Sequence, residues 1–165
     1  MTVYKKILVP YDTSKPSEIA LEHAITIAKM SAMYTNTTID VIVLHVVQEM
    51  PVPTTFGINL FKSKQTGDMI TLEQYLKDIT LEIKKDAENM LEEKIEKYRN
   101  NENVSLEVQV LIGNPSDQII QFANGERMEL IIMGNTGLGG FSKIVSGSVA
   151  KNLSEKANCP VMLVR

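Results

Sequence analysis

The stretch Lys6-Ile-Leu-Val-Pro-Tyr-Asp-Thr-Ser-Lys-Pro16 carries the clearest indication of the fold. Its first part, Lys6–Pro10, is a short apolar run rich in branched residues, which is typical of a buried strand. Its second part, residues 12–16, offers hydroxyl and carboxylate side chains that can cap a helix, followed by a proline suited to the first helical turn. The stretch therefore predicts a strand that leads directly into a helix.

The same succession of strand and helix continues along the chain. Strands separated by helices are parallel and are joined by helical crossovers. We therefore predict an α/β fold: one doubly wound domain over residues 1–165, with an open five-stranded parallel sheet and helices on both faces. The predicted strands are 6–10, 40–47, 105–111, 130–133 and 161–164, and the predicted helices begin near residues 16, 71, 115 and 148.

Composition narrows the class of protein. The chain has 165 residues, of which 44% are hydrophobic and 22% charged, as in a globular domain. A net charge of −3 argues against general binding of nucleic acid through its phosphates. The single cysteine, Cys159, rules out a disulfide within the chain, and no apolar run approaches the roughly 20 residues of a membrane span. We expect a cytoplasmic protein that binds neither nucleic acid nor membrane.

The segment from Gln48 to Asp68 interrupts this regular pattern with prolines and glycines. It predicts a long mobile loop, to which Phe56, Leu60 and Phe61 give a short helical turn. A long helix over residues 71–98 follows, with an apolar stripe made of Leu72, Leu76, Ile79, Ile83, Ala87, Met90 and Ile95.

A glycine-rich loop follows the fourth predicted strand, between Met133 and Ser148. Glycine lets the backbone approach an oxyanion and present its amides. A helix that begins at Gly147 and Ser148 points free amides and the positive end of its dipole at the same anion. The loop therefore suggests a cradle for a di- or triphosphate, and a flexible connector between strand and helix is the alternative.

Asp12 follows the first predicted strand and is the second candidate for chemistry. Its carboxylate can accept hydrogen bonds from ribose hydroxyls or an adenine amino group, and a helix cap is the alternative role. Ligands of open α/β sheets bind beyond the carboxyl ends of the strands, where the strand order reverses, so Asp12 and the glycine loop can face one crevice. His45 lies inside an apolar strand, where we expect a hydrogen-bonded core residue.

Taken in order, these segments resemble the universal stress protein family, in particular its ATP-binding branch. The glycine pattern Gly134-x2-Gly137-x9-Gly147-Ser148 resembles the family's nucleotide loop, and Lys6–Asp12 resembles its first strand and acidic turn. Leu44–Val47, Gly113–Pro115 and Cys159–Val164 resemble its later landmarks. The resemblance implies the strand order 3-2-1-4-5, a homodimer, and ATP or AMP as the ligand, with any Mg²⁺ carried by the nucleotide phosphates.

The resemblance also implies which residues hold the nucleotide. Asp12 would contact the adenosine, and the backbone of Val46 would contact adenine. Two positions depart from the commonest pattern of the family: Ala150 stands where a serine or threonine can add a phosphate contact, and Gly139 and Gly140 make the loop looser. Both departures imply weaker triphosphate binding or a preference for AMP. The complete set of implied ligand-binding residues is Pro10, Tyr11, Asp12, Val46, Met133, Gly134, Asn135, Thr136, Gly137, Gly147, Ser148 and Val149.

The function that these observations favour is that of a regulatory or stress-response protein which binds an adenine nucleotide. The sequence offers no catalytic constellation and no pair of metal-binding aspartates. A slow ATP-hydrolysing enzyme and an interaction module without a nucleotide remain the alternatives. Val161–Val164 is apolar and, by the resemblance, lies at the sheet edge, so we expect the homodimer to form through this strand.

Overall fold

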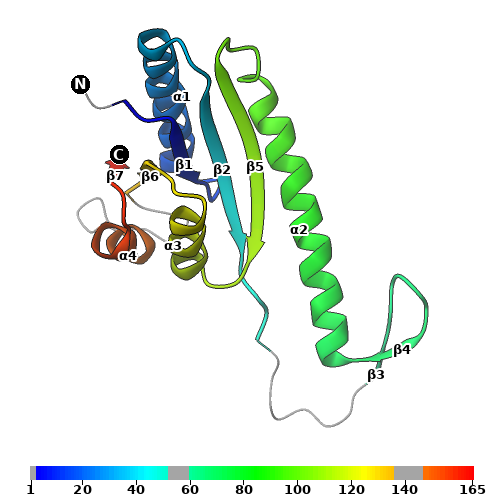
Figure 1. Cartoon of the computed structure of the whole chain (residues 1–165). Coiled ribbons are helices and arrows are strands. Elements are labelled where there is room, and N and C mark those ends of the chain that lie inside the picture. Colours follow the sequence, from blue (N-terminus) through cyan, green and yellow to red (C-terminus); the bar gives the residue numbers. More distant parts are fainter. Residues whose placement is uncertain (1–2, 52–59, 136–146) are drawn as a thin grey trace.

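A five-stranded parallel sheet forms the centre of the protein, in the order β5-β2-β1-β6-β7 (Figure 1). The computed structural model describes residues 3–51, 60–135 and 147–165. Counted along the chain, the five strands follow the expected order 3-2-1-4-5, which confirms the predicted fold. The strands are β1 (Lys6–Pro10), β2 (Ile39–Val47), β5 (Val104–Ile112), β6 (Leu130–Gly134) and β7 (Val161–Val164).

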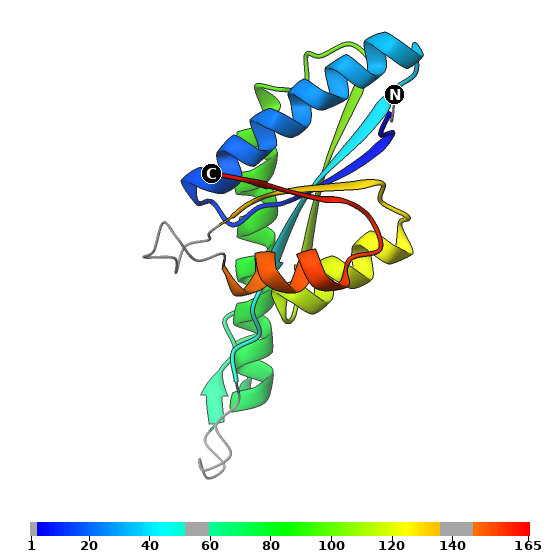
Figure 2. The same ribbon diagram turned by 90° about the vertical axis from the view of Figure 1, so that its left-hand side faces the viewer.

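Helices cover both faces of this sheet (Figure 2). The helices α1 (Lys15–Thr35) and α2 (Leu72–Glu96) pack on one face, and α3 (Pro115–Gly125) and α4 (Ser148–Lys156) pack on the other. Side chains of β1 alternate between the two cores, so that Ile7 and Val9 face α1 and α2 while Leu8 faces α3 and α4. All three are fully buried, and burying a side chain of this size contributes roughly 1.5–3 kcal/mol.

The strand order reverses between β1 and β6. β2 and β5 lie on one side of β1, whereas β6 and β7 lie on its other side. The connections that leave the carboxyl ends of β1 and β6 therefore run to opposite faces of the sheet, with α1 on one and α4 on the other. This divergence leaves space for a ligand between them.

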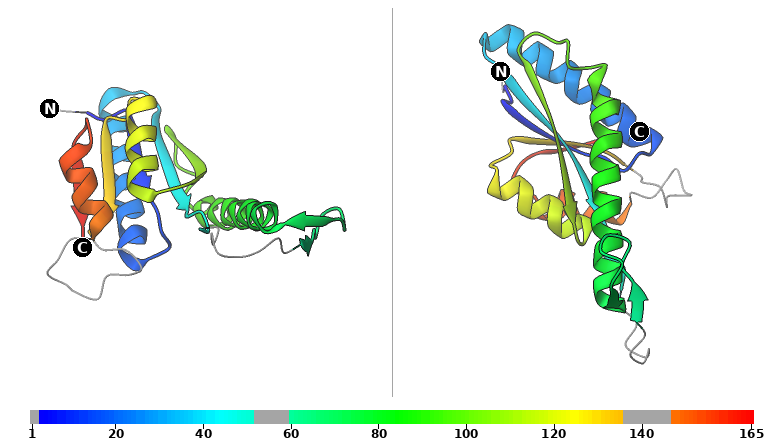
Figure 3. Two further views of the ribbon diagram at one scale, coloured as in Figure 1. Left: turned by 90° about the horizontal axis from the view of Figure 1, so that it is seen from below. Right: turned by 90° about the vertical axis from the view of Figure 1, so that its right-hand side faces the viewer.

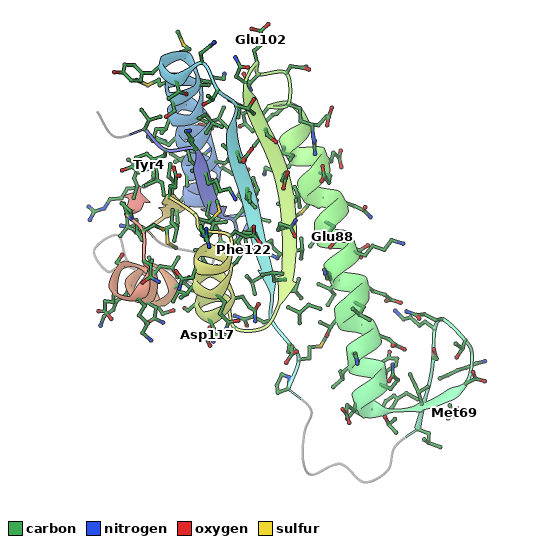
Figure 4. All side chains as sticks on the ribbon, in the orientation of Figure 1. Tyr4, Met69, Glu88, Glu102, Asp117 and Phe122 are labelled. Carbon is green, nitrogen blue, oxygen red and sulfur yellow. The ribbon has the colours of Figure 1, made fainter. Side chains whose placement is uncertain are left out.

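A β-hairpin occupies part of the segment that was expected to be a loop. β3 (Leu60–Lys62) pairs with β4 (Met69–Thr71) in antiparallel fashion, so the predicted helical turn at Leu60 and Phe61 is wrong. The physical reason is the aromatic ring of Phe61, which stacks on Tyr75 of α2 with the ring centroids 5.1 Å apart. Met69 marks this hairpin at the end of α2 (Figure 4). Residues 52–59 lie outside the described part of the chain.

The long helix α2 is only partly covered by the sheet. Its N-terminal part extends beyond the sheet and carries the hairpin (Figure 3). Leu91 and Ile95 in the other part are fully buried, whereas Ile83 and Met90 of the predicted stripe are 42% and 41% exposed. The stripe is therefore only partly a core face, because the helix is longer than the sheet that it covers.

β7 forms one edge of the sheet, as the strand order requires. Its side chains Met162 and Leu163 are each 39% exposed, which is unusual for apolar residues on opposite faces of one strand.

Among the described helices, none has the length and apolar character needed to cross a membrane.

Candidate functional site

A cavity of about 600 Å³ opens at the carboxyl end of the sheet, where the strand order reverses. This volume lies within the range typical of small-molecule sites. Every predicted site residue that the structure describes lines the cavity, whereas Thr136 and Gly137 lie outside the described residues. The predicted residues on its wall are Pro10, Tyr11, Asp12, Val46, Met133, Gly134, Asn135, Gly147, Ser148 and Val149.

Asp12 holds the turn that joins β1 to α1. Its Oδ1 accepts hydrogen bonds from the backbone N–H of Ser14, at 3.1 Å, and from the Ser14 hydroxyl, at 2.5 Å. Ser14 itself is the N-cap of α1, since its Oγ accepts a hydrogen bond from the N–H of Ser17. The helix-cap role considered for Asp12 therefore belongs to Ser14, and Asp12 stands on the cavity wall.

His45 also lines the cavity, which the sequence analysis missed. The ring is hydrogen-bonded, as expected, because its Nδ1 lies 2.7 Å from the carbonyl oxygen of Tyr11. However, β1 ends at Pro10, opposite Leu44, so His45 is the first residue of β2 without a partner in β1. A polar residue near the end of an otherwise apolar strand was the signal that could have placed it at the cavity.

Other wall residues were not predicted either. α3 contributes Pro115 and Ile119, which lie one helical turn apart, and the loop after β2 contributes Gln48. The sequence showed that Pro115 begins a helix, but it did not show which side of the cavity this helix closes. The remaining unpredicted wall residues are Ser17, Leu44 and Ala150.

The opposite side of the cavity is built where β6 ends and α4 begins. The backbone N–H of Asn135 donates to the carbonyl of Val164 at 2.8 Å, and its carbonyl accepts from the N–H of Gly147 at 2.9 Å. These bonds fix both ends of the glycine-rich loop, whose residues 136–146 lie outside the described part. The residues on either side of the loop are therefore hydrogen-bonded to each other, and Asn135 is also bonded to the edge strand β7.

Three helices begin at the cavity, and α4 differs from the other two. Ser14 caps α1, and the Asn114 side chain caps α3 by accepting a hydrogen bond from the N–H of Asp117. In the described residues, no side chain caps α4, whose N-cap is Gly147. Because Gly147 has no side chain, the N-cap position itself offers no acceptor to the first backbone amides of α4, and Ser148 and Val149 line the cavity there.

Gly134 has a packing role that its sequence context did not reveal. A Cβ atom at this position would lie 2.6 Å from the Cβ of Pro16 and 2.9 Å from its carbonyl carbon. Real atoms do not approach so closely, so only glycine allows the first turn of α1 to pack against the end of β6. This glycine therefore brings the two sides of the cavity together.

A charged cluster lies behind the Asp12 turn. Lys94 of α2 forms an ion pair with Glu18 of α1, and its ammonium lies 5.7 Å from the centroid of the Tyr11 ring. Hydrogen bonding to Lys94 lowers the pKa of Glu18, and the same bond raises the pKa of Lys94 above its ordinary range. Burial raises the pKa of Tyr11, so its side chain is a neutral phenol at pH 7.

A metal site and a reactive thiol each place requirements on the described residues. Within the described ranges, no group of three or more histidine, cysteine, aspartate or glutamate side chains is placed to hold a metal ion. Burial raises the pKa of the Cys159 thiol, which makes it less reactive. On the cavity wall, Asp12 offers a hydrogen-bond acceptor, and the first backbone amides of α4 offer donors.

Comparison with known proteins gives consistent results over the whole chain. The model of a family described as the universal stress protein family matches residues 3–165. Universal stress protein MJ0577 of Methanocaldococcus jannaschii is 30% identical over 163 residues, which cover 99% of this chain and 96% of that protein.

Solved structures show the same fold. Universal stress protein UspA from Lactobacillus plantarum superposes with a TM-score of 0.79 at 20% identity, and each chain is covered completely. A universal stress protein family protein from Arabidopsis thaliana, solved with AMP bound, gives a TM-score of 0.54 at 18% identity, covering 97% of this chain and 90% of that one.

Proposed function

The chain belongs to the universal stress protein family, and we propose that it is an adenine-nucleotide-binding member that acts as a homodimeric regulatory or stress-response protein. One observation carries the proposal: the side-chain-uncapped N-terminus of α4 and the carboxylate of Asp12 line the same cavity. A nucleotide has an anionic end and a nucleoside end with hydroxyl and amino donors, which match these two walls.

In the proposed complex, the phosphates lie at the start of α4. The amides of Ser148 and Val149 and the Ser148 hydroxyl donate hydrogen bonds to phosphate oxygens. Gly147 lets the phosphate approach the backbone, because it has no side chain. Any Mg²⁺ is carried by the phosphates themselves.

The nucleoside lies on the other wall. Asp12 accepts a hydrogen bond from a ribose hydroxyl, and the backbone of Val46 meets the adenine edge. The apolar residues Met133 and Ile119 line the same cavity and offer a surface against which the base can pack. As support, a protein of the same fold was solved with AMP bound.

Either ATP or AMP fits this proposal. Ala150 lies in the first turn of α4 on the cavity wall, and because alanine has no hydroxyl this position adds no contact to a longer phosphate chain. We therefore propose that the preference for ATP over AMP is small. The proposed domain comprises residues 1–165, since the family match extends over almost all of them.

The homodimer is proposed to form through β7. This strand is at the sheet edge, and Met162 and Leu163 expose apolar surface on both of its faces. Two-fold pairing of β7 with its copy would satisfy the backbone groups of the edge and cover these side chains.

Calorimetric titration tests the proposed ligand. We expect ATP and AMP to bind with micromolar affinity, roughly −7 to −8 kcal/mol. Gly147→Val should abolish measurable binding, because a branched side chain occupies the space of the phosphate. Val149→Ala is the matched control: it lies two residues further along and keeps its backbone amide, so it should bind within a few-fold of wild type. Absence of heat and of thermal stabilisation at millimolar ATP would refute the proposal.

A further inference from the structure

The end of β2 reaches further than the end of β1, which leaves its last residues beside a turn. β1 pairs with β2 up to Pro10 and Leu44, whereas β2 continues to Val47 and pairs there with β5. The space that a longer β1 would fill is taken by the residues that follow it, Tyr11 and Asp12. The position of Asp12 is therefore not set by regular sheet pairing alone.

The backbone of Tyr11 is held by β2 through two hydrogen bonds. Its N–H donates to the carbonyl of Leu44 at 2.8 Å, and its carbonyl oxygen lies 2.7 Å from Nδ1 of His45. A carbonyl oxygen can only accept, so the ring must carry a proton on Nδ1. The second bond is thus made by a side chain, and it fixes the peptide that joins Tyr11 to Asp12.

The turn that follows needs such external support. Thr13 has a φ of 67°, a conformation that is unfavourable for a β-branched residue. Conformations of this kind persist only where surrounding contacts impose them. The bonds from Ser14 to Asp12 act within the turn, whereas the bond from His45 ties the turn to the sheet.

From these contacts we propose that His45 is the positioning residue for the nucleoside end of the cavity. Its Nδ1–H holds the Tyr11 carbonyl and thereby places the Asp12 carboxylate against the ribose. The inference rests on the proposed function, since it assigns a specificity role within the same site. It makes a distinct statement, however: loss of this bond weakens ligands that contain a nucleoside and spares those that contain phosphates alone.

The experiment compares substitutions at His45 by calorimetry with ATP and with inorganic triphosphate. His45→Phe keeps a ring and loses the donor, and we expect ATP to bind about tenfold more weakly while triphosphate binding is unchanged. His45→Asn retains an N–H donor at the position of Nδ1, so ATP affinity should stay within about threefold of wild type. His45→Gln moves the amide donor one bond further from the backbone and should therefore bind ATP as weakly as His45→Phe. It serves as the second variant without the bond if His45→Phe does not fold.

His23 supplies a matched control on the same protein. It is the other of the two histidines, it is exposed on α1, and its Nδ1 contacts the carbonyl of Ile19 at 2.9 Å. His23→Asn should leave the affinity for both ligands unchanged. The same variant removes the signals of His23 from the nitrogen NMR spectrum of the imidazole rings and so identifies those of His45. With no ligand present, this spectrum should show that the neutral His45 ring carries its proton on Nδ1.

The outcomes distinguish a failure of the positioning role from a failure of the proposed function. Two results with a wild type that binds ATP would show that the positioning role is wrong while the proposed function stands. In the first, His45→Asn loses as much ATP affinity as His45→Phe. In the second, His45→Phe weakens the binding of triphosphate as much as that of ATP. A proton on Nε2 of neutral His45 would likewise overturn the inference alone. If wild type binds no nucleotide, the proposed function and this inference both fall.

Discussion

Replacement of Gly134 by alanine tests how the two sides of the cavity are joined. The added Cβ would lie 2.6 Å from the Cβ of Pro16, 2.9 Å from its carbonyl carbon and 3.1 Å from the N of Ser17. Two of these three atoms belong to the backbone, so no side-chain rotation relieves the contact. The first turn of α1 must move away from the end of β6.

The expected loss of unfolding free energy follows from the steric overlap of an added methyl group in a packed interior. Extra methyl groups in well-packed interiors destabilise proteins by typically 1–3 kcal/mol, and the rigid neighbours at Gly134 place this variant at about 2–3 kcal/mol. For a protein of this size, that corresponds to a fall in Tm of roughly 4–12 °C. ATP affinity should fall as well, because Asp12 lies in the turn that joins β1 to α1 and is displaced when the first turn of α1 moves.

Gly125→Ala is the matched control. Gly125 is the last residue of α3, and a Cβ there would meet no atom within 4 Å. Alanine at this position should be neutral or stabilise the protein by up to about 1 kcal/mol. Urea denaturation of both variants provides the measurement. If Gly134→Ala lowers the unfolding free energy by less than about 0.5 kcal/mol, the close approach of α1 and β6 is not as described.

Three further predictions concern the turn, the ion pair and the sheet edge. Asp12→Ala should weaken ATP binding and spare inorganic triphosphate in calorimetry, and equal losses for both would contradict the nucleoside role. Hydrogen bonding to Lys94 lowers the pKa of Glu18, so their pairing stabilises the fold fully above the ordinary glutamate pKa of 4.5, and this stabilisation is lost progressively as pH falls from 4.5 through the lowered pKa. The difference in unfolding free energy between wild type and Glu18→Gln in urea should therefore shrink as pH falls below 4.5, and a difference that does not depend on pH would contradict the pairing. Leu163→Pro should convert the dimer to a folded monomer of 18.4 kDa in light scattering, because backbone N–H groups alternate along a strand and that of Leu163 points away from β6. Met162→Pro should also unfold the sheet edge, because the N–H of Met162 points toward β6. A Leu163→Pro variant that stays dimeric would exclude β7 as the interface.

The sequence predicted the sheet because each strand carries a strong local signal. The apolar run of β1 and the cap and proline of α1 required no knowledge of the rest of the chain. The same is true of α3, where the predicted cap, Asn114, makes the expected hydrogen bond. By contrast, the strand order and the edge position of β7 came from the family resemblance and not from periodicity.

Features that depend on distant contacts could not be predicted in this way. The helical stripe of α2 was visible, but the point where the sheet ends beneath it was not, so Ile83 and Met90 were misplaced. The hairpin at Leu60 and Phe61 depends on a ring in α2, which local propensity does not encode. The role of His45 depends on β1 being shorter than β2 at the cavity, and neither strand shows this by itself.

A crystal structure of the protein purified without added nucleotide, and then of crystals soaked with ATP, tests the central claim most directly. We predict density for an adenine nucleotide in the cavity, with phosphate oxygens within hydrogen-bond distance of the amides of Ser148 and Val149 and the ribose beside Asp12. Density for the nucleotide elsewhere on the protein, or an unchanged cavity at millimolar ATP, would contradict the account.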